Sequence, residues 1–210
     1  MIPIGIKSGA PRSDPTLTTI ARAALSLVGF TVLGFTVASC LPVTLVSVTP
    51  AATPAIAALV AAGVAHEVLT YHHDARSASY GEEAVAALAG FNGVVPEQIL
   101  KTLIVSGPSG LAVAVLPVPW KLSLKAVAAA LGWPKATMAE RSAAERSTGY
   151  VLGGISPLGQ RRKLPTVVDD SALRFDRVLC SAGRRGWDLA LEPHDLTRLT
   201  RAVVANIRSV

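Results

Sequence analysis

Short apolar runs that alternate with short helical segments are the feature of this sequence that most limits its fold. Residues 99–105 and 111–118 are two such runs, and the segment 106–110 between them is rich in Gly, Pro and Ser and has the length of a hairpin turn. We therefore expect the two runs to pair as antiparallel strands. Because further strands of mixed spacing alternate with helices, the chain is expected to form an α/β or α+β domain with a mixed sheet.

The elements around this hairpin follow from hydrophobic periodicity and from turn residues. Helices are expected over residues 54–62, 80–89, 124–131, 139–146 and 193 to about 207. Strands are expected over residues 66–71, 99–105, 111–118, 150–152, 166–168, 178–181 and 188–191. Half of the 210 residues are hydrophobic, which is enough for one sizeable core. We expect a single domain over residues 48–210, with a mixed, barrel-like sheet surrounded by helices.

The first 47 residues differ in character from the rest of the chain. Residues 23–48 carry no charge and include an apolar stretch that resembles a membrane span, with basic residues before it and a loosely lipoprotein-like cleavage pattern at residues 37–40. This segment is either a signal or anchor, or it lies outside the working protein because the start codon was assigned too far upstream. We favour the second interpretation, with Val48 as the natural start, and expect residues 1–47 to pack on nothing.

Several classes of site find no support in the residues. Cys40 and Cys180 lie far apart in unlike surroundings, and the four histidines have no metal-binding spacing. The chain has no phosphate loop, no Gly-x-Ser-x-Gly nucleophile elbow, no His-Glu-x-x-His motif and no paired-cysteine motif. We therefore expect neither a metal nor another cofactor. The net charge of +6 suits a polyanionic partner but is weak support for one.

A glycine-rich loop over residues 149–160 is the first candidate functional segment. It holds four glycines and a Ser-Pro pair inside an apolar stretch. Glycine lacks a Cβ, so the backbone of this loop is expected to approach something closely. The residues alone leave two interpretations open, namely a loop that forms a site and a tight turn at a sheet edge.

Lys101 and two basic clusters are further candidates. Lys101 interrupts the apolar run 99–105, where a lysine usually faces solvent but can also line a pocket. The basic clusters lie beside glycines and consist of Arg161, Arg162 and Lys163 in one case and Arg184 and Arg185 in the other. Such clusters are usually solvated, and they can also bind phosphates.

Taken in order, these motifs resemble those of the YbaK/EbsC family of aminoacyl-tRNA deacylases, and within it the bacterial Cys-tRNA(Pro) deacylases. The similar segments have near-family spacing and cover residues 70–74, 100–103, 111–118, 146–160, 164–166 and 181–186. The resemblance implies a mixed, barrel-like sheet with helices around it, related to the editing domain of many bacterial prolyl-tRNA synthetases. Residues 1–47 have no family counterpart, and the 106–110 turn is shorter than in some relatives.

The resemblance also implies which residues form the site. Lys101 matches the essential lysine of the family, which is expected to hold the 3′-terminal nucleotide of the tRNA. Gly153 and Gly154 match the glycine loop whose backbone faces the aminoacyl ester, and such a loop can direct bare N–H groups at an oxygen that gains charge. Three further positions are expected to bind the substrate in the same pocket: Tyr71, Ser181 and Asp188.

Three hypotheses about function follow. The first is a trans-editing deacylase that cleaves the ester of mischarged tRNA, with Cys-tRNA(Pro) as the expected substrate and, since no Ser/Cys-His pair is evident, with help from the substrate thiol. The second is a non-catalytic module that binds aminoacyl-tRNA and acts with prolyl-tRNA synthetase. The third, a membrane-tethered or exported protein, depends wholly on residues 1–47. We favour the first, with tRNA and prolyl-tRNA synthetase as partners and the cytoplasm as location.

Overall fold

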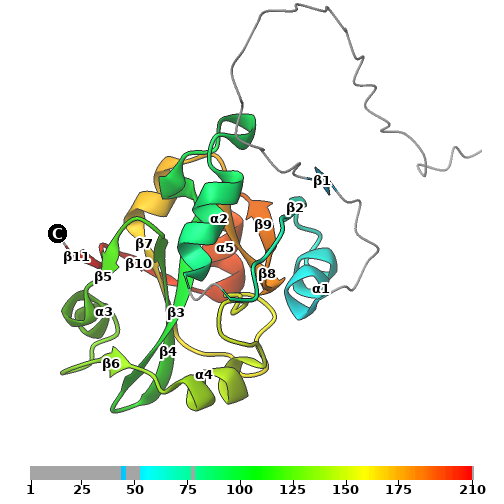
Figure 1. Ribbon diagram of the computed structural model, residues 1–210. Coiled ribbons are helices and arrows are strands. Elements are labelled where there is room, and N and C mark those ends of the chain that lie inside the picture. The colour runs from blue at the N-terminus through cyan, green and yellow to red at the C-terminus, as the bar shows by residue number, and fades with distance from the viewer. Residues whose placement is uncertain (1–43, 46–52, 77–78, 210) are drawn as a thin grey trace, which may run out of the picture. The chain divides into compact units, whose positions relative to one another are not determined.

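The computed structural model describes residues 44–45, 53–76 and 79–209 (Figure 1). Most of the segment 1–47 lies outside these residues, so its expected dispensability stays a prediction. Strand β1 (Thr44–Leu45) pairs antiparallel with β2 (His66–Thr70). The expectation that nothing before Val48 packs on the domain is therefore wrong for the backbone of these two residues. No helix in the described part of the chain combines the length and the apolar character that a bilayer crossing requires.

The first sheet is antiparallel and has the strand order β1-β2-β9-β8. Strand β9 (Trp187–Leu191) lies between β2 and β8 (Val178–Arg184). Asp188 is opposite Leu69 on one side and Ser181 on the other. The pairing of β8 with β9 is irregular between Ser181 and Arg184. This register brings two of the expected site residues onto neighbouring strands.

The second sheet has the order β10-β7-β4-β3-β6 and is mixed, as expected from the sequence. Its strands are β3 (Leu100–Gly107), β4 (Gly110–Pro117), β6 (Thr137–Met138), β7 (Thr166–Asp169) and β10 (Val203–Ala205). Strands β3 and β4 form the expected antiparallel hairpin, while β7 runs parallel to both β4 and β10. A separate two-stranded sheet pairs β5 (Lys121–Leu122) with β11 (Arg208–Ser209).

The two larger sheets meet along one edge of β3. At its start, Ile99 forms a parallel bridge with Leu179 of the β8 region, and toward its other end Val105 pairs with Met138 of β6. Between these contacts, residues 101–103 have no strand partner on that side within the described residues. The strand pairing thus continues from one sheet into the other but does not close into a barrel there, and it leaves a gap beside the middle of the edge.

Helices cover the faces of both sheets. They are α1 (Pro54–Ala61), α2 (Tyr80–Leu88), α3 (Leu124–Ala130), α4 (Arg141–Thr148) and α5 (Pro193–Thr200), with short 3-10 turns η1 (Phe91–Gly93), η2 (Pro96–Gln98) and η3 (Asp170–Arg174). The largest core cluster joins α1 and α5 to side chains of both sheets. Helix α2 packs on the opposite face of the first sheet, and α3 packs on the second. The expected arrangement of helices around a mixed sheet is confirmed.

Local capping explains where two of the helices begin. The Thr53 hydroxyl accepts a hydrogen bond from the Ile56 N–H at 3.2 Å, and Pro54 occupies the first helical position, where its missing N–H costs nothing. The Ser123 hydroxyl accepts from the Ala126 N–H in the same way at the start of α3. Each cap satisfies one of the N–H groups that a helix end leaves without an internal partner.

Three sequence-based expectations about elements are wrong. Residues 150–152 form a turn and not a strand, and Tyr150 is buried with its hydroxyl donating to the Leu158 carbonyl at 2.8 Å. Helix α4 begins at Arg141, because the two residues before Ala139 pair with β3 as β6. The final helix ends at Thr200: Arg201 adopts a left-handed φ of 51°, and the β-branched pair that follows enters the second sheet as β10.

Candidate functional site

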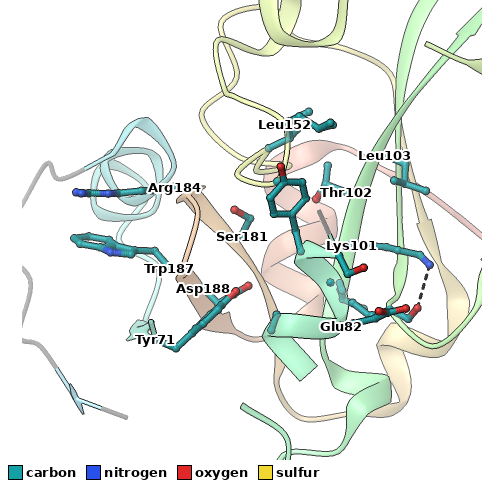
Figure 2. Close-up of a pocket in the computed structure, with 18 residues that line it drawn as sticks. Tyr71, Glu82, Lys101, Thr102, Leu103, Leu152, Ser181, Arg184, Trp187 and Asp188 are labelled. Atoms are coloured by element: carbon teal, nitrogen blue, oxygen red, sulfur yellow. Dashed lines mark hydrogen bonds between the residues drawn. The ribbon is translucent and has the colours of Figure 1, made fainter. Parts of the chain in front are cut away.

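A pocket of about 320 Å³ lies beside the gap between β3 and β8, next to the first turn of α2 (Figure 2). Its walls come from segments that are far apart in the chain: the end of β2, the start of α2, the first half of β3, the glycine loop and the β8–β9 hairpin. Five of the six residues expected to carry catalysis and substrate binding line it, namely Tyr71, Lys101, Gly153, Ser181 and Asp188. The size is that of a typical small-ligand site.

Lys101 is partly buried in this pocket and does not simply project into solvent. Its Nζ donates a hydrogen bond to the Val118 carbonyl at 3.0 Å, drawn as the dashed line in Figure 2. Burial lowers the pKa of Lys101, and the nearby Glu82 carboxylate acts against that change. The ammonium group has further donors beyond the one it spends on Val118, so it can hold an anionic group of a ligand.

Asp188 is a buried carboxyl on the pocket wall, with only 4% of its surface exposed. Burial raises the pKa of Asp188 to about 6, and a hydrogen bond from the Tyr71 hydroxyl partly offsets the increase. The pKa of Tyr71 is raised as well, first by burial and then by the Asp188 charge. A carboxyl with a pKa of about 6 is mostly ionised at neutral pH, so it can accept a proton from an attacking group.

The backbone around Tyr71 and Ser181 is held by the tip of the β8–β9 hairpin. The Tyr71 N–H donates to the Gly186 carbonyl at 2.8 Å, and a Cβ added at Gly186 would lie 2.6 Å from the Tyr71 carbonyl oxygen. The Ser181 hydroxyl accepts a hydrogen bond from the Gly183 N–H at 3.3 Å. These contacts fix Tyr71 and Ser181 on the same wall as Asp188.

The glycine loop lines one wall of the pocket, and its backbone approaches its neighbours closely, as its glycines predict. Gly153 has a left-handed φ of +84°, and a Cβ there would lie 2.6 Å from the Tyr80 ring. A Cβ at Gly154 would lie 3.2 Å from the backbone of Arg184. The loop backbone therefore touches α2 on one side and the β8–β9 hairpin on the other, and larger residues would push these neighbours away.

Gly154 does not fit its expected role as a hydrogen-bond donor to the substrate. Its N–H donates to the Val151 carbonyl at 2.9 Å, within the loop itself, and Gly154 is absent from the pocket lining. Within the described residues, the N–H groups of Gly153 and Ile155 have no hydrogen-bond partner, and both residues line the pocket. These two are the loop donors that remain available to a ligand.

The pocket residues that the sequence does not predict include four with aromatic or polar side chains. Tyr80 and Glu82 come from the first turn of α2, Thr102 follows Lys101 on β3, and Trp187 precedes Asp188 on β9. The Thr102 hydroxyl is buried and has no hydrogen-bond partner in the described part of the chain. Tyr80 reaches the pocket only because α2 packs across the first sheet, so no local pattern could have revealed it. For Thr102 and Trp187, the one sequence signal that they line the pocket is that each lies next to a residue matched to the family's site.

The two basic clusters differ in their relation to the pocket. Arg184 lines it, and the Arg185 guanidinium lies 4.9 Å from the centre of the Tyr80 ring while its Nε donates to the Leu152 carbonyl. The other cluster is exposed and does not line the pocket; its members are Arg161, Arg162 and Lys163. The structure therefore brings only one of the clusters to the candidate site.

Histidine and cysteine nucleophiles or metal ligands are not part of the pocket lining. Cys180 is completely buried in the main core, and burial raises the pKa of its thiol. His73 pairs its Nδ1 with Glu83 at 2.7 Å outside the lining residues. Within the described residues, no group of three or more His, Cys, Asp or Glu side chains could hold a metal ion.

Comparisons with known proteins identify the family to which the chain belongs. The family described as the aminoacyl-tRNA editing domain matches residues 81–199. EbsC of Enterococcus faecalis, named as a candidate Cys-tRNA(Pro)/Cys-tRNA(Cys) deacylase, is 36% identical over 116 residues, which are 55% of this chain and 71% of EbsC. The family match over residues 81–199 includes most of the segments that line the pocket.

Solved structures show the same fold. A candidate trans-editing enzyme for prolyl-tRNA synthetase superposes with a TM-score of 0.67 at 25% identity, covering 78% of this chain and 100% of that structure. The hypothetical protein APE2540 superposes with a TM-score of 0.65 at 28% identity, covering 75% of this chain and 100% of that one.

Proposed function

This chain belongs to the aminoacyl-tRNA editing domain family, and we propose that it is a trans-editing deacylase whose preferred substrate is cysteine attached to tRNA(Pro). Family membership confirms the resemblance seen in the sequence and establishes the class of activity, the cleavage of an aminoacyl ester. One observation carries the rest of the proposal. A single pocket combines a partly buried lysine, a glycine loop with unspent N–H groups and a carboxyl whose pKa is about 6.

Lys101 is proposed to bind the phosphate or ribose of the 3′-terminal nucleotide. Its Nζ is held by the Val118 carbonyl, so the charge is fixed in direction before a ligand arrives. A fixed cation next to an anionic group reduces the entropy that binding would otherwise cost. Positioning of this kind is the main resource of a site without a nucleophile of its own, since correct placement alone can contribute several kcal/mol, about 7–11 in favourable cases.

The ester carbonyl is proposed to lie against the glycine loop, where the N–H groups of Gly153 and Ile155 can donate to the oxygen as it gains charge. The loss of one such donor typically lowers the rate about 10²–10³-fold in acyl-transfer enzymes. Gly154 contributes in a different way. Its N–H closes the turn with Val151, and its missing side chain lets the loop lie against the hairpin.

The substrate thiol is proposed as the attacking group. The cysteine sulfur attacks its own ester carbonyl carbon, the bond from this carbon to the ribose oxygen breaks, and that oxygen takes a proton as the tRNA leaves. The amino acid departs as a four-membered thiolactone, which water then opens to cysteine. Ring strain opposes the attack, whereas the effective molarity of a well-oriented intramolecular group, up to about 10⁵–10⁸ M, favours it. Asp188 is the proposed acceptor of the thiol proton.

The test compares three charged forms of tRNA(Pro), carrying cysteine, serine or S-methylcysteine. Rapid loss of cysteine alone is expected, because only cysteine has a free thiol. Equal rates for all three would show that water attacks and would remove the thiol from the proposal, while deacylation as such would stand. No deacylation of any of them would favour the non-catalytic binding module, which the naming of the relatives does not favour.

The proposed partners follow from the substrate. The 3′ acceptor end of tRNA is the ligand, and prolyl-tRNA synthetase is the proposed source of mischarged tRNA(Pro), in line with the description of one structural relative. Because tRNA is charged in the cytoplasm, the proposal includes a cytoplasmic location. The exposed cluster around Arg162 stays a proposed contact for tRNA phosphates beyond the 3′ end, since it does not line the pocket.

A further inference from the structure

The β8–β9 hairpin presents an unusual pair of side chains beside the pocket. The Arg184 guanidinium lies over the Trp187 ring, 5.1 Å from its centre, and both residues line the pocket. Figure 2 shows the two groups stacked at one end of the site, apart from Ser181 and Lys101. Arg184 is exposed and Trp187 is partly exposed, so a ligand can reach the stack.

Arg184 differs from the other arginines that lie on aromatic rings. Arg185 covers Tyr80 but donates its Nε to Leu152, and Arg208 covers Trp120 at 5.8 Å but is paired with two aspartates. The Arg184 guanidinium has no hydrogen bond or ion pair to any residue that the structure describes. The Arg184 guanidinium is therefore a planar cation whose N–H donors are all available to a ligand.

The hairpin holds this stack rigidly. Trp187 lies on the central strand β9, opposite Thr70 on one side and Arg184 on the other. The Gly186 carbonyl at the hairpin tip accepts from the Tyr71 N–H. A Cβ at Gly183 would lie 2.6 Å from the buried Tyr150 ring, so the backbone leading into Arg184 is packed as well. A preorganised surface of this kind loses little entropy when a flat group stacks on it.

We propose that the Arg184–Trp187 stack is a platform for a nucleobase of the single-stranded 3′ end of the tRNA, next to the nucleotide whose ester enters the pocket. This proposal rests on the proposed function, because that function brings a single-stranded 3′ end to the pocket. Unpaired bases stack on aromatic rings and on guanidinium planes, and such stacking does not depend strongly on base identity. The unspent donors of Arg184 can contact the neighbouring phosphate in addition.

The experiment measures the affinity of the full-length protein for an uncharged acceptor-stem minihelix by fluorescence anisotropy. The unpaired 3′ nucleotides are replaced one at a time by an abasic nucleotide. Trp187→Ala is expected to weaken binding of the intact RNA about tenfold, the typical effect of losing one base–aromatic stack. One abasic position before the terminal nucleotide should weaken binding to the wild type by a similar factor and should leave the affinity of Trp187→Ala unchanged.

Matched variants separate stacking from folding and from charge. Trp120→Ala removes another Arg–Trp stack, one that does not line the pocket, and should bind the RNA like the wild type. Arg184→Lys keeps the positive charge without the planar group, so it should lose most of the dependence on the base. Arg184 is exposed, and replacing it opens no cavity, which keeps the test valid if Trp187→Ala proves unstable.

Two results would overturn the platform: equal binding by the wild type, Trp187→Ala and Arg184→Lys, or a Trp187→Ala defect that persists unchanged at every abasic position. Because the RNA carries no amino acid, the measurement does not require deacylation. Deacylation without base-dependent binding would contradict the platform and leave the proposed function standing. Base-dependent binding without deacylation would contradict the proposed function and leave the platform standing.

Discussion

Strands β3 and β4 pair residue by residue along the central hairpin, but their environments differ. Strand β4 has β3 on one edge and β7 on the other, and its side chains from Ala112 to Leu116 are completely buried. Strand β3 is paired along one edge by β4, whereas its other edge is open between Ile99 and the pairing with β6. Lys101 and Thr102 stand in this open section, opposite Leu116 and Val115.

This difference between β3 and β4 shows how one sheet can form a polar site directly beside a hydrophobic core. A strand that is paired on both edges and covered on both faces has room only for apolar side chains. A strand with an open edge can place a lysine beside a cavity and still leave its partner strand in the core. In the cross-strand pair Lys101–Leu116, which we call the rung, Lys101 is therefore expected to contribute to activity and Leu116 to stability. Substitutions at the two positions test this expectation.

The largest expected effect is on stability, at the β4 end of this rung. Leu116→Ala should lower the free energy of unfolding by about 2–5 kcal/mol, because a fully buried leucine is lost and the rigid hairpin can fill the cavity only in part. Urea denaturation followed by circular dichroism measures the loss. The folded fraction should keep most of its deacylase activity. A loss of activity without a loss of stability would mean that the rung does not divide the two roles.

The β3 end of the rung should give the opposite result. Lys101→Met keeps the length of the side chain but removes its charge, so the rate of deacylation should fall about a hundredfold or more as the substrate loses its anchor. The free energy of unfolding should change by less than about 1 kcal/mol, as for a residue outside the packed core. Lys121→Met on β5, an exposed lysine away from the pocket, is the control and should leave both quantities unchanged.

Asp188 extends the comparison to pH. If its carboxylate accepts the proton in the reaction, the deacylation rate should rise about tenfold per unit below pH 6 and level off above it. Asp188→Asn should be slow at every pH and lack this rise. A wild-type profile that is flat from pH 5 to 8 would exclude Asp188 as the proton acceptor.

The same carboxyl should make stability depend on pH in the opposite direction. Its pKa in the folded protein is raised from 3.8 to about 6, so between these values the folded chain binds more protons than the unfolded chain. Its contribution to the free energy of unfolding therefore falls as pH rises through this window, by about 3 kcal/mol at most. The difference between wild type and Asp188→Asn, measured by denaturation at each pH, isolates this contribution from that of the other carboxyls.

The smallest expected effects come from two glycines with left-handed φ. Gly153→Ala and Gly90→Ala should each cost about 1 kcal/mol in backbone strain. Only Gly153 faces an obstacle, the Tyr80 ring at 2.6 Å from the added methyl carbon, while nothing lies within 4 Å at Gly90. Deacylation should therefore fall in Gly153→Ala and remain normal in Gly90→Ala. Equal activity of both variants would show that the loop and Tyr80 need not keep their present contact.

Much of this arrangement could be predicted from the sequence because it rests on local patterns. The hairpin follows from two long apolar runs with a Gly/Pro/Ser spacer, and the glycine loop and Lys101 stand out against their apolar surroundings. Both of the latter do line the pocket. The long runs carry enough signal on their own, whereas the residues alone leave the roles of the glycine loop and Lys101 open, and only the resemblance to the deacylase family implies a site there.

The parts that could not be predicted depend on distant partners. Strands β5, β6, β10 and β11 have only two or three residues each, too few for a periodic pattern, and exist because another strand lies beside them. The pattern at residues 150–152 predicts a strand, but the segment forms a turn, and the burial of Tyr150 comes from a tertiary contact with Gly183. The hydrogen bond from the Gly154 N–H to the Val151 carbonyl likewise forms only in the folded loop.

The contact between Tyr150 and Gly183 also bears on how the pocket can adapt to substrates of different size. The Tyr150 ring occupies the space that a side chain at Gly183 would need, Gly154 lies against the next stretch of the hairpin, and Arg185 bonds back to Leu152. These contacts connect the loop to the hairpin, so an outward movement of one would break them unless the other moved with it. Tyr80 of α2 belongs to the same set of contacts, because it lies against Gly153 and under Arg185, so widening the pocket on this side for a bulkier amino acid requires the loop, the hairpin and α2 to move together.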